Sequence, residues 1–517
     1  MLTRKQRLAI IGAGLFVFVA GAVLWLVPKF LNSYILRDKI ERIAADRFHV
    51  DVTLASLHIS TFPLLRVQFT GLVLKDPNRP ELPPLIKIDK CSVEASLFSL
   101  LEHQSRLHWL HMEGITINIP PHANSQQASP SSPKNPFRTN FAIDEITSDD
   151  MTLNILRSGG DRHMSFLLHK LRIDSFQPDH PAAFHANLIN PKPVGEIQTN
   201  GQFGPWNPND PSQSPVSGSY TFSNADLGTI KGISGTLSST GSFNGVLDYI
   251  QVQGKTETPN FEVSISQHTV PLDTEFSAVV DGINGNTILN TIDVQLVDSK
   301  LIVKGDVAKG PQQPGRAVAL NVVADSARIQ DLLRVAVKSN KPLLTGLVSL
   351  KTRFVIPSRR SKDTDITNRI DLTGKFGIVS ARFTEGMVQE KINALSRRGQ
   401  GHPNETDDGT AVSALGGAFT LRNGMIQFSK LTFDVAGAAV LLNGSYNLNT
   451  EVLNFRGTLT LQAKLSQTTT GMKSLFLKLI DPLFKKKNAG AVLPIKITGT
   501  REKPSFGLDM GRVFARN

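Results

Sequence analysis

Strict alternation of apolar and polar residues runs through most of this chain and predicts β-strands. The pattern begins at Val50, Val52 and Leu54, which stand between polar residues, and returns clearly at Ile115, Ile117 and Ile119. Alternate side chains of a strand point to opposite faces, so each such strand has one apolar and one polar face. The same pattern continues from residue 141 to about residue 465. The chain is therefore predicted to be mainly β.

One uncharged segment, Leu8–Val27, departs from the alternation near the N-terminus. Its twenty residues match the roughly 30 Å hydrocarbon core of a bilayer when they form a helix. Arg4, Lys5 and Arg7 precede it, and such flanks stay in the cytoplasm. The alternative is a cleaved signal peptide ending at Ala22, but the apolar run continues past that residue. We expect a retained single-pass anchor with the bulk of the chain on the far side.

Four further segments have helical rather than strand spacing of apolar residues: 30–48, 327–337, 387–398 and 468–487. The last has one apolar face flanked by lysines, and it is either a membrane-docking helix or a plug for the end of the β-structure. The predicted docking residues are Met472, Leu475, Phe476, Leu479, Ile480, Leu483, Lys485, Lys486 and Lys487.

A short glycine and aromatic signature recurs at irregular spacing. It consists of a glycine, one residue and then Phe or Tyr, and we interpret it as a turn glycine followed by the aromatic residue that opens the next strand. Its six occurrences begin at Gly201, Gly218, Gly241, Gly374, Gly417 and Gly444.

The positive charge of the chain is concentrated at its two ends. The whole sequence has a net charge of +12, with +5 in residues 1–50 and +8 in residues 464–517, so the long central part is close to neutral. A nucleic-acid-binding protein would have a basic stripe across its folded body, so we expect no nucleic-acid partner. Basic ends suit anionic membrane surfaces, although ordinary solvated charges would look the same.

The sequence contains no recognisable catalytic, metal or cofactor motif. A Gly-Lys-Ser/Thr phosphate loop and a Gly-x-Ser-x-Gly elbow are both missing. His108 and His111 would point to opposite faces of a strand and could not share a metal ion. The sequence from Asp281 to Asn286 is interpreted as a hairpin turn rather than a calcium loop. Residues 396–401 are interpreted as a helix end with basic residues and a glycine stop. We therefore expect a protein that is not an enzyme and needs no cofactor.

Two blocks of the chain resemble AsmA-like proteins, within the wider group of repeating β-groove lipid-transfer proteins. The N-terminal block spans residues 1–120, and the C-terminal block spans residues 374–508. The motifs that carry the resemblance are VTL (52–54), LHIS (57–60), GLVL (71–74), NGSY (443–446), LQAKLSQTTTG (461–471) and PSF (504–506).

The resemblance implies a fold, a function and a location. The expected fold is an N-terminal transmembrane helix followed by a long, curved, mostly antiparallel β-groove with a few short amphipathic helices. The expected function is conduction of phospholipid along the groove between the inner and outer membranes of a bacterial envelope. The chain would be anchored in the inner membrane, with its bulk in the periplasm and its C-terminal end near the outer membrane or a protein there. The alternative is an envelope-assembly scaffold that carries no lipid.

This reading divides the chain into five parts and singles out a lipid track. The parts are an anchor (1–29), an N-terminal AsmA-like domain (30–120), a polar linker (121–140), a central β-groove (141–373) and a C-terminal AsmA-like domain (374–517). The predicted lipid-facing residues are Phe261, Val263, Ile265, Ile292, Val294 and Leu296.

Overall fold

The computed structural model describes most of the predicted β region. The described residues are 41, 51–60, 65–75, 77, 81, 83–95, 105–119, 141–155, 164–177, 179–205, 207, 210–309, 315–339, 341–358, 369–405, 411–468 and 490–509. The predicted anchor, the linker at 121–140 and residues 469–487 of the predicted docking helix lie outside them. Among the described residues, no helix is both long enough and apolar enough to cross a membrane.

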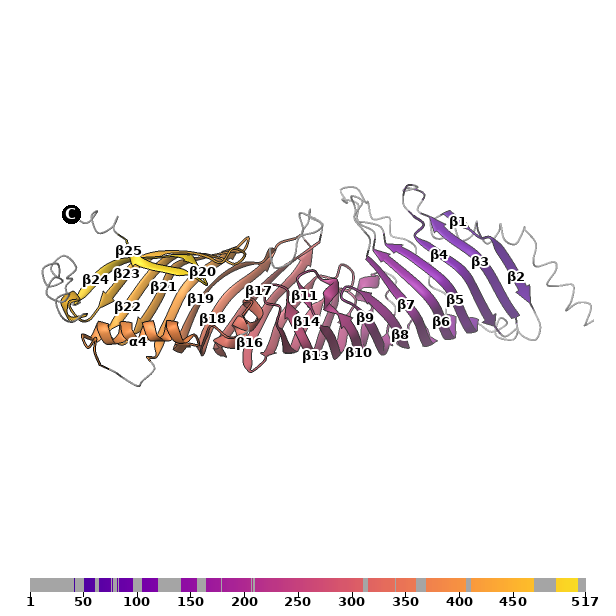
Figure 1. The fold of residues 1–517 in the computed structure, drawn as a ribbon. Helices are drawn as coiled ribbons and strands as arrows, with labels where there is room; N and C mark the ends of the chain where they lie inside the picture. Colours follow the sequence, from indigo (N-terminus) through magenta and orange to yellow (C-terminus); the bar gives the residue numbers. More distant parts are fainter. Residues whose placement is uncertain are drawn as a thin grey trace, which may run out of the picture. The chain divides into compact units, whose positions relative to one another are not determined.

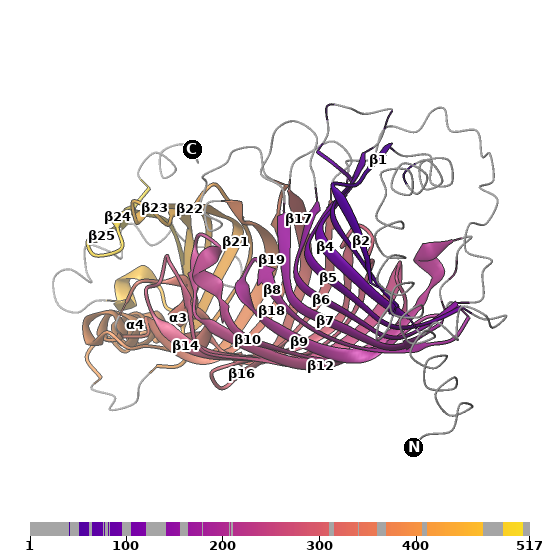
Figure 2. The same ribbon diagram turned by 90° about the vertical axis from the view of Figure 1, so that its right-hand side faces the viewer.

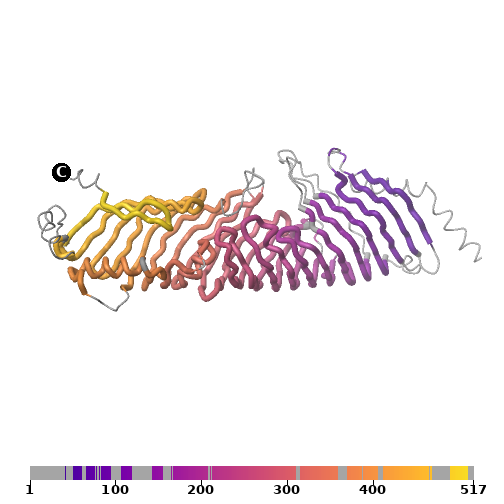
Figure 3. The backbone as a smooth tube through the Cα atoms, in the orientation of Figure 1, coloured from indigo at the N-terminus to yellow at the C-terminus, as the bar shows by residue number. Residues whose placement is uncertain are grey.

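The chain divides into two compact units, which we describe separately. Unit 1 contains residues 1–225, 240–252 and 281–283, and unit 2 contains residues 226–239, 253–280 and 284–517. The described part of the chain has 25 strands (Figures 1 and 3). The prediction of a mainly β, open and mostly antiparallel structure with few helices is confirmed.

Unit 1 is built from consecutive strands of the N-terminal half. These are β1 (Asp51–Thr53), β2 (Ser56–Ser60), β3 (Leu65–Lys75), β4 (Ile86–Ala95), β5 (Ser105–Ile119), β6 (Phe141–Ile155), β7 (Met164–Phe176), β8 (Ala182–Pro191), β9 (Val194–Phe203) and β10 (Pro215–Asp226). Neighbours along the chain pair antiparallel from β3 to β5 and from β6 to β9, whereas β5 and β6 pair in parallel.

Unit 2 holds the C-terminal strands. The chain passes between the units in β10, β12 (Thr236–Val246), β13 (Tyr249–Val263) and the β14–β15 turn, and β11 (Ile233–Ser234) pairs with β13. The strands that follow are β14 (Thr269–Val280), β15 (Thr287–Leu296), β16 (Ser299–Lys309), β17 (Arg316–Arg328), β18 (Leu344–Ile356), β19 (Asp371–Phe383), β20 (Ser413–Arg422), β21 (Met425–Val435), β22 (Ala438–Asn447), β23 (Val452–Leu461), β24 (Ala491–Thr500) and β25 (Pro504–Leu508).

The strands of unit 2 form an antiparallel ladder in which each strand pairs with the next. Every pair from β14–β15 to β24–β25 is antiparallel. Many of these strands bend along their length (Figure 2). Several of the pairs contain a register shift, and β-bulges are a common cause of such bending.

Two helices of unit 2 lie where the sequence predicts helices. Helix α3 (Ile329–Ala336) matches the predicted segment 327–337, and α4 (Gly386–Gln400) matches the segment 387–398. Helix α4 lies beside the strand ends (Figure 1). It runs two residues beyond the predicted end and stops at Gly401, which has a φ of 87° and donates its N–H to the carbonyls of Arg397 and Arg398.

The interpretation of the glycine and aromatic signature is wrong. All six glycines lie inside strands, at positions such as Gly201 in β9, Gly374 in β19 and Gly417 in β20. The physical reason is cross-strand packing rather than a turn. At Gly417, an added Cβ atom would lie 3.1 Å from Cε1 of Phe376, so the missing side chain leaves room for the ring of the neighbouring strand.

The smaller chemical predictions hold where they can be seen. Residues 281–286 join β14 to β15 as a turn, in which the side chain of Asp281 accepts the N–H of Ile283 at 2.9 Å. His108 and His111 lie three residues apart in β5 and have different partners, Asp144 and Thr147.

Candidate functional site

The predicted lipid-facing residues lie in unit 2, and the structure brings part of them together. Ile292, Val294 and Leu296 share one face of β15, and Leu296 is 6% exposed. Phe261 of β13 and Val294 pack against the same buried cluster that contains Leu296. The structure therefore unites Phe261, Val294 and Leu296 at one end of the apolar face.

Two of the predicted residues lie differently from the sequence pattern. Val263 is the last residue of β13 and stands opposite Ile233. Ile265 lies in the turn after β13, so the predicted alternation does not extend to it. The reason is local: Ser266 is fully buried, and its Oγ donates to the carbonyl of Val263 at 3.0 Å, which closes the turn. The docking residues between Met472 and Lys487 lie outside the described residues.

A continuous row of side chains crosses the apolar face of unit 2, with one residue from each strand. Each member stands directly opposite the next in the strand register, from β14 to β25. Eleven of its twelve members are apolar residues or glycine. We call it the central row: Phe276, Ile292, Val303, Val322, Thr352, Gly374, Phe419, Phe428, Gly444, Phe455, Ile497 and Phe506.

Two flanking rows on the same face follow the same rule. One runs from β14 to β25 through Ala278, Leu289, Gly305, Leu320, Phe354, Leu372, Leu421, Ile426, Tyr446, Leu453, Gly499 and Pro504. The other runs from β17 to β25 through Ala324, Leu350, Phe376, Gly417, Leu431, Leu442, Gly457, Ile495 and Leu508. The face is thus apolar over several residues along each strand.

The two helices cover only one end of this face. Ile329, Leu332 and Val335 of α3 pack on the cluster that includes Leu296 and Val348. In the same way, apolar residues of α4 pack on the ends of β21, β22 and β24. The central row lies farther along each strand, and most of its side chains are half-buried rather than buried. We call the central row and its two flanking rows the open strip; at β17, β18 and β19 it adjoins the cluster on which α3 packs.

Phenylalanine rings form a ladder across the open strip. The ring centroids of Phe376 and Phe419 are 6.1 Å apart, those of Phe419 and Phe428 are 6.5 Å apart, and those of Phe428 and Phe455 are 5.8 Å apart. Such distances and tilted orientations are favourable for aromatic pairs. The ladder therefore gives β19, β20, β21 and β23 a nearly continuous aromatic surface.

Two copies of the glycine and aromatic signature build the centre of this ladder reciprocally. Gly374 stands opposite Phe419, and Phe376 stands opposite Gly417, because β19 and β20 run antiparallel. Each ring lies beside a position that has no side chain. The signature could therefore have located the open strip from the sequence alone, if its glycines had been assigned to strand interiors.

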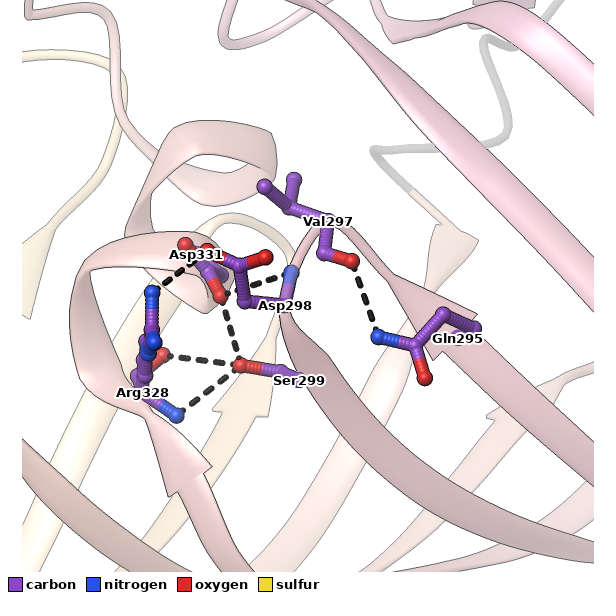
Figure 4. Close-up of polar contacts among 6 residues, drawn as sticks. All are labelled: Gln295, Val297, Asp298, Ser299, Arg328 and Asp331. Atoms are coloured by element: carbon purple, nitrogen blue, oxygen red, sulfur yellow. Dashed lines mark hydrogen bonds and ion pairs between the residues drawn. The ribbon is translucent and has the colours of Figure 1, made fainter.

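A polar clasp attaches α3 to the β15–β16 turn (Figure 4). The Oγ of Ser299 donates to Oδ2 of Asp331 at 2.8 Å and accepts the N–H of Arg328 at 2.9 Å. Asp331 and Ser299 are 3% and 1% exposed. The Arg328 guanidinium pairs with Asp298. The clasp fixes the helix over the covered end of the apolar face.

The open strip carries little chemistry of its own. Burial, assisted by the nearby Glu451 carboxylate, raises the pKa of the Tyr446 phenol above its ordinary value, so this side chain is neutral at physiological pH. Among the described residues, no group of three His, Cys, Asp or Glu side chains could hold a metal ion. The arrangement suits the binding of an apolar ligand.

Comparison of the chain with protein-family models, with curated proteins and with solved structures gives no match.

Proposed function

We propose that this chain is an AsmA-like, membrane-anchored protein that conducts phospholipid along an apolar β-groove between the inner and outer membranes. In this proposal Leu8–Val27 holds the chain in the inner membrane, and the periplasmic strands provide the track. The open strip of unit 2 is the part of that track that the described residues support.

The half-buried state of the open strip is the observation that carries the proposal. Side chains in the core of a filled β-sandwich would be fully covered, whereas Phe419 and Phe428 keep part of their surface exposed. Phe506, at the last strand, is 63% exposed. Exposed apolar patches on soluble domains mark binding surfaces more often than chance. A lipid tail on this strip would recover about 0.8 kcal/mol for each CH₂ group removed from water.

The polar opposite face explains how such a strip can exist in an aqueous compartment. Along β21, Gln427 and Ser429 are exposed on the side opposite to Phe428. Lipid tails would lie against the rings while the other face remains hydrated. The strand alternation thus places a ligand on one side only.

Native mass spectrometry of the full chain, released from detergent, tests the proposal. We expect co-purified phospholipid on the wild type and much less on the Phe428→Lys variant, because an ammonium group on the strip would have to lose its water beside acyl chains. The matched control is Gln427→Lys, which places the same charge on the opposite face of the same strand and is expected to retain lipid. Thermal unfolding of both variants separates a binding defect from a folding defect.

The scaffold alternative predicts a different result. A protein that supports envelope assembly without carrying lipid would appear free of phospholipid in the wild type. Equal lipid loss in the two variants, at equal thermal stability, would also contradict a one-sided track at β21.

A further inference from the structure

A pocket of about 770 Å³ lies on unit 2 and is lined mainly by residues of the polar face, together with Leu350, Gly374, Phe376 and Phe419 of the open strip. Most of its lining residues alternate with those of the open strip along β18 to β21, and the register places them side by side. Its polar lining comprises two lysines and several groups that can donate hydrogen bonds. These residues include Lys351, Thr373, Lys375, Thr420 and Gln427.

The lysines of this pocket stand in an unfavourable arrangement. Lys351 of β18 lies directly opposite Lys375 of β19. Lys375 is opposite Ala418, and Ala418 is opposite Lys430 of β21. Directly opposed side chains have Cβ atoms about 5 Å apart, and like charges in that position destabilise a sheet. The opposed ammonium groups of Lys351 and Lys375 therefore raise the energy of the empty pocket, and Lys430, which does not line it, adds a third positive charge nearby.

Within the described ranges, no acidic side chain compensates these charges. Among the described residues, none that lines the pocket is acidic, and Lys351, Lys375 and Lys430 form no ion pair. Another lysine on the same face of unit 2 does have an acidic partner: the ammonium group of Lys255 is 3.5 Å from the carboxylate of Glu275. The sheet thus pairs a lysine with an acid elsewhere but leaves the pocket lysines together.

We propose that this pocket binds a phosphomonoester group. A phosphomonoester carries between one and a half and two negative charges at neutral pH and has three strong acceptor oxygens. Lysine ammonium groups bind phosphate as point charges. The hydroxyls of Thr373 and Thr420 and the amide of Gln427 can donate to the remaining oxygens. A single carboxylate or phosphodiester carries one charge and would leave the opposed lysines partly uncompensated.

Small residues make the approach of a compact anion feasible. Gly377, two residues from Lys375 on β19, and Ala418, opposite Lys375 on β20, line the pocket beside the lysine pair. An added Cβ atom at Gly377 would have only the Ser349 hydroxyl nearby, at 3.2 Å, so the backbone at that point is not covered by other side chains. A phosphoryl group can therefore lie close to the strands, between the ammonium groups.

The full chain, purified in a detergent with a neutral headgroup, provides the test. Its affinity for inorganic phosphate and for glycerol 3-phosphate is measured by calorimetry at constant ionic strength, with sodium chloride as the reference. We expect saturable binding of both phosphate compounds. The Lys351→Gln/Lys375→Gln variant should bind them at least tenfold more weakly. The control Lys304→Gln removes a lysine from the same face outside the pocket and should leave the affinity unchanged.

Thermal unfolding of the same proteins gives an independent readout. Phosphate should raise the unfolding midpoint of the wild type and of the control but not that of the double variant. Without phosphate, the double variant should unfold at the same or a higher temperature, because the like-charge repulsion is gone. If the double variant does not fold, the two single glutamine variants supply the same comparison.

Three outcomes would overturn the proposal. The first is an equal response of the wild type to phosphate and chloride, and the second is undiminished phosphate binding by the double variant. The third is binding to phosphatidylglycerol vesicles with no binding of the soluble phosphates, which would assign the lysines to a phosphodiester membrane surface. None of these outcomes bears on the lipid content of the open strip, so this site and the proposed lipid function are tested separately.

Discussion

Replacing Ser299 with alanine is expected to destabilise unit 2 by about 3 kcal/mol, because the clasp beneath α3 depends on this one hydroxyl. Ser299 connects a buried carboxylate to a part-buried backbone group: it donates to the carboxylate of Asp331 and accepts the backbone N–H of Arg328. Alanine fits the same space but can do neither. The carboxylate then keeps only the longer bond from the N–H of Asp298, at 3.3 Å.

The magnitude follows from the two lost hydrogen bonds. A bond to a charged group contributes about 1.5–3 kcal/mol, and a buried N–H left without a partner costs about 1–3 kcal/mol. The two losses share one hydroxyl and are not additive, so about 3 kcal/mol is expected for the pair. In a unit of this size each kcal/mol lowers the unfolding temperature by roughly 2–4 °C. The variant should therefore unfold about 6–12 °C below the wild type.

Two measurements check this prediction. Thermal unfolding followed by circular dichroism gives the midpoint, and hydrogen exchange shows whether Ile329–Ala336 opens locally. The matched control is Ser349→Ala, because Ser349 is exposed and makes only a 3.3 Å bond to the carbonyl of Gly377. That control should change stability by less than about 0.5 kcal/mol. A loss below about 1 kcal/mol in Ser299→Ala, with unchanged exchange in α3, would refute the reasoning.

Four further predictions concern single positions. Burial raises the pKa of the Cys91 thiol to about 12, so this only cysteine should not react with a disulfide reagent at pH 8 until urea unfolds the protein; rapid native labelling would contradict this. The pKa of the Tyr446 phenol is raised in the folded protein. The neutral phenol therefore contributes its full stabilisation below the pKa of the unfolded chain, about 10, and this contribution is lost as pH rises through the pKa of the folded protein. Unfolding midpoints measured above pH 10 should therefore fall less in Tyr446→Phe than in the wild type. Gly417→Ala should destabilise by about 1–3 kcal/mol, because its Cβ would lie 2.7 Å from a backbone oxygen. Gly386→Ala, with nothing within 4 Å, should stabilise by a few tenths of a kcal/mol or more in chemical unfolding.

The alternation of apolar and polar residues was sufficient to predict the fold class. It specifies strands and their two faces directly, because side chains alternate at every residue. The helices α3 and α4 were also predictable, because the spacing of apolar residues in these segments changes from every second residue to about every three and a half residues. Local patterns of this kind depend only on neighbouring residues. The sequence alone is therefore almost sufficient to predict the strands and helices.

The candidate site was harder to predict, because it depends on which residues stand opposite one another. Phe276 and Phe506 belong to the same row although they are far apart in the chain, and the connection passes through eleven strand pairs. A shift of one residue in any of these pairs would move a whole strand to the other face. The predicted set around Ile292 therefore lies on the apolar face of β15 but does not give the extent of the row.

Register also explains why Gly374 and Gly417 were misinterpreted. In a single sequence a glycine before an aromatic residue resembles a turn, because turns are where glycine is most often needed. The antiparallel pairing of β19 with β20 instead places each glycine against the ring of the other strand. A glycine without a side chain weakens a strand, and here the ring covers the gap. On the other face of β19, the pairing with β18 brings Lys375 opposite Lys351. The register of β18, β19 and β20 thus fixes both the open strip and the lysine pocket, so a variant that shifts it is expected to change the two sites together, whereas side-chain replacements on either face should affect them one at a time.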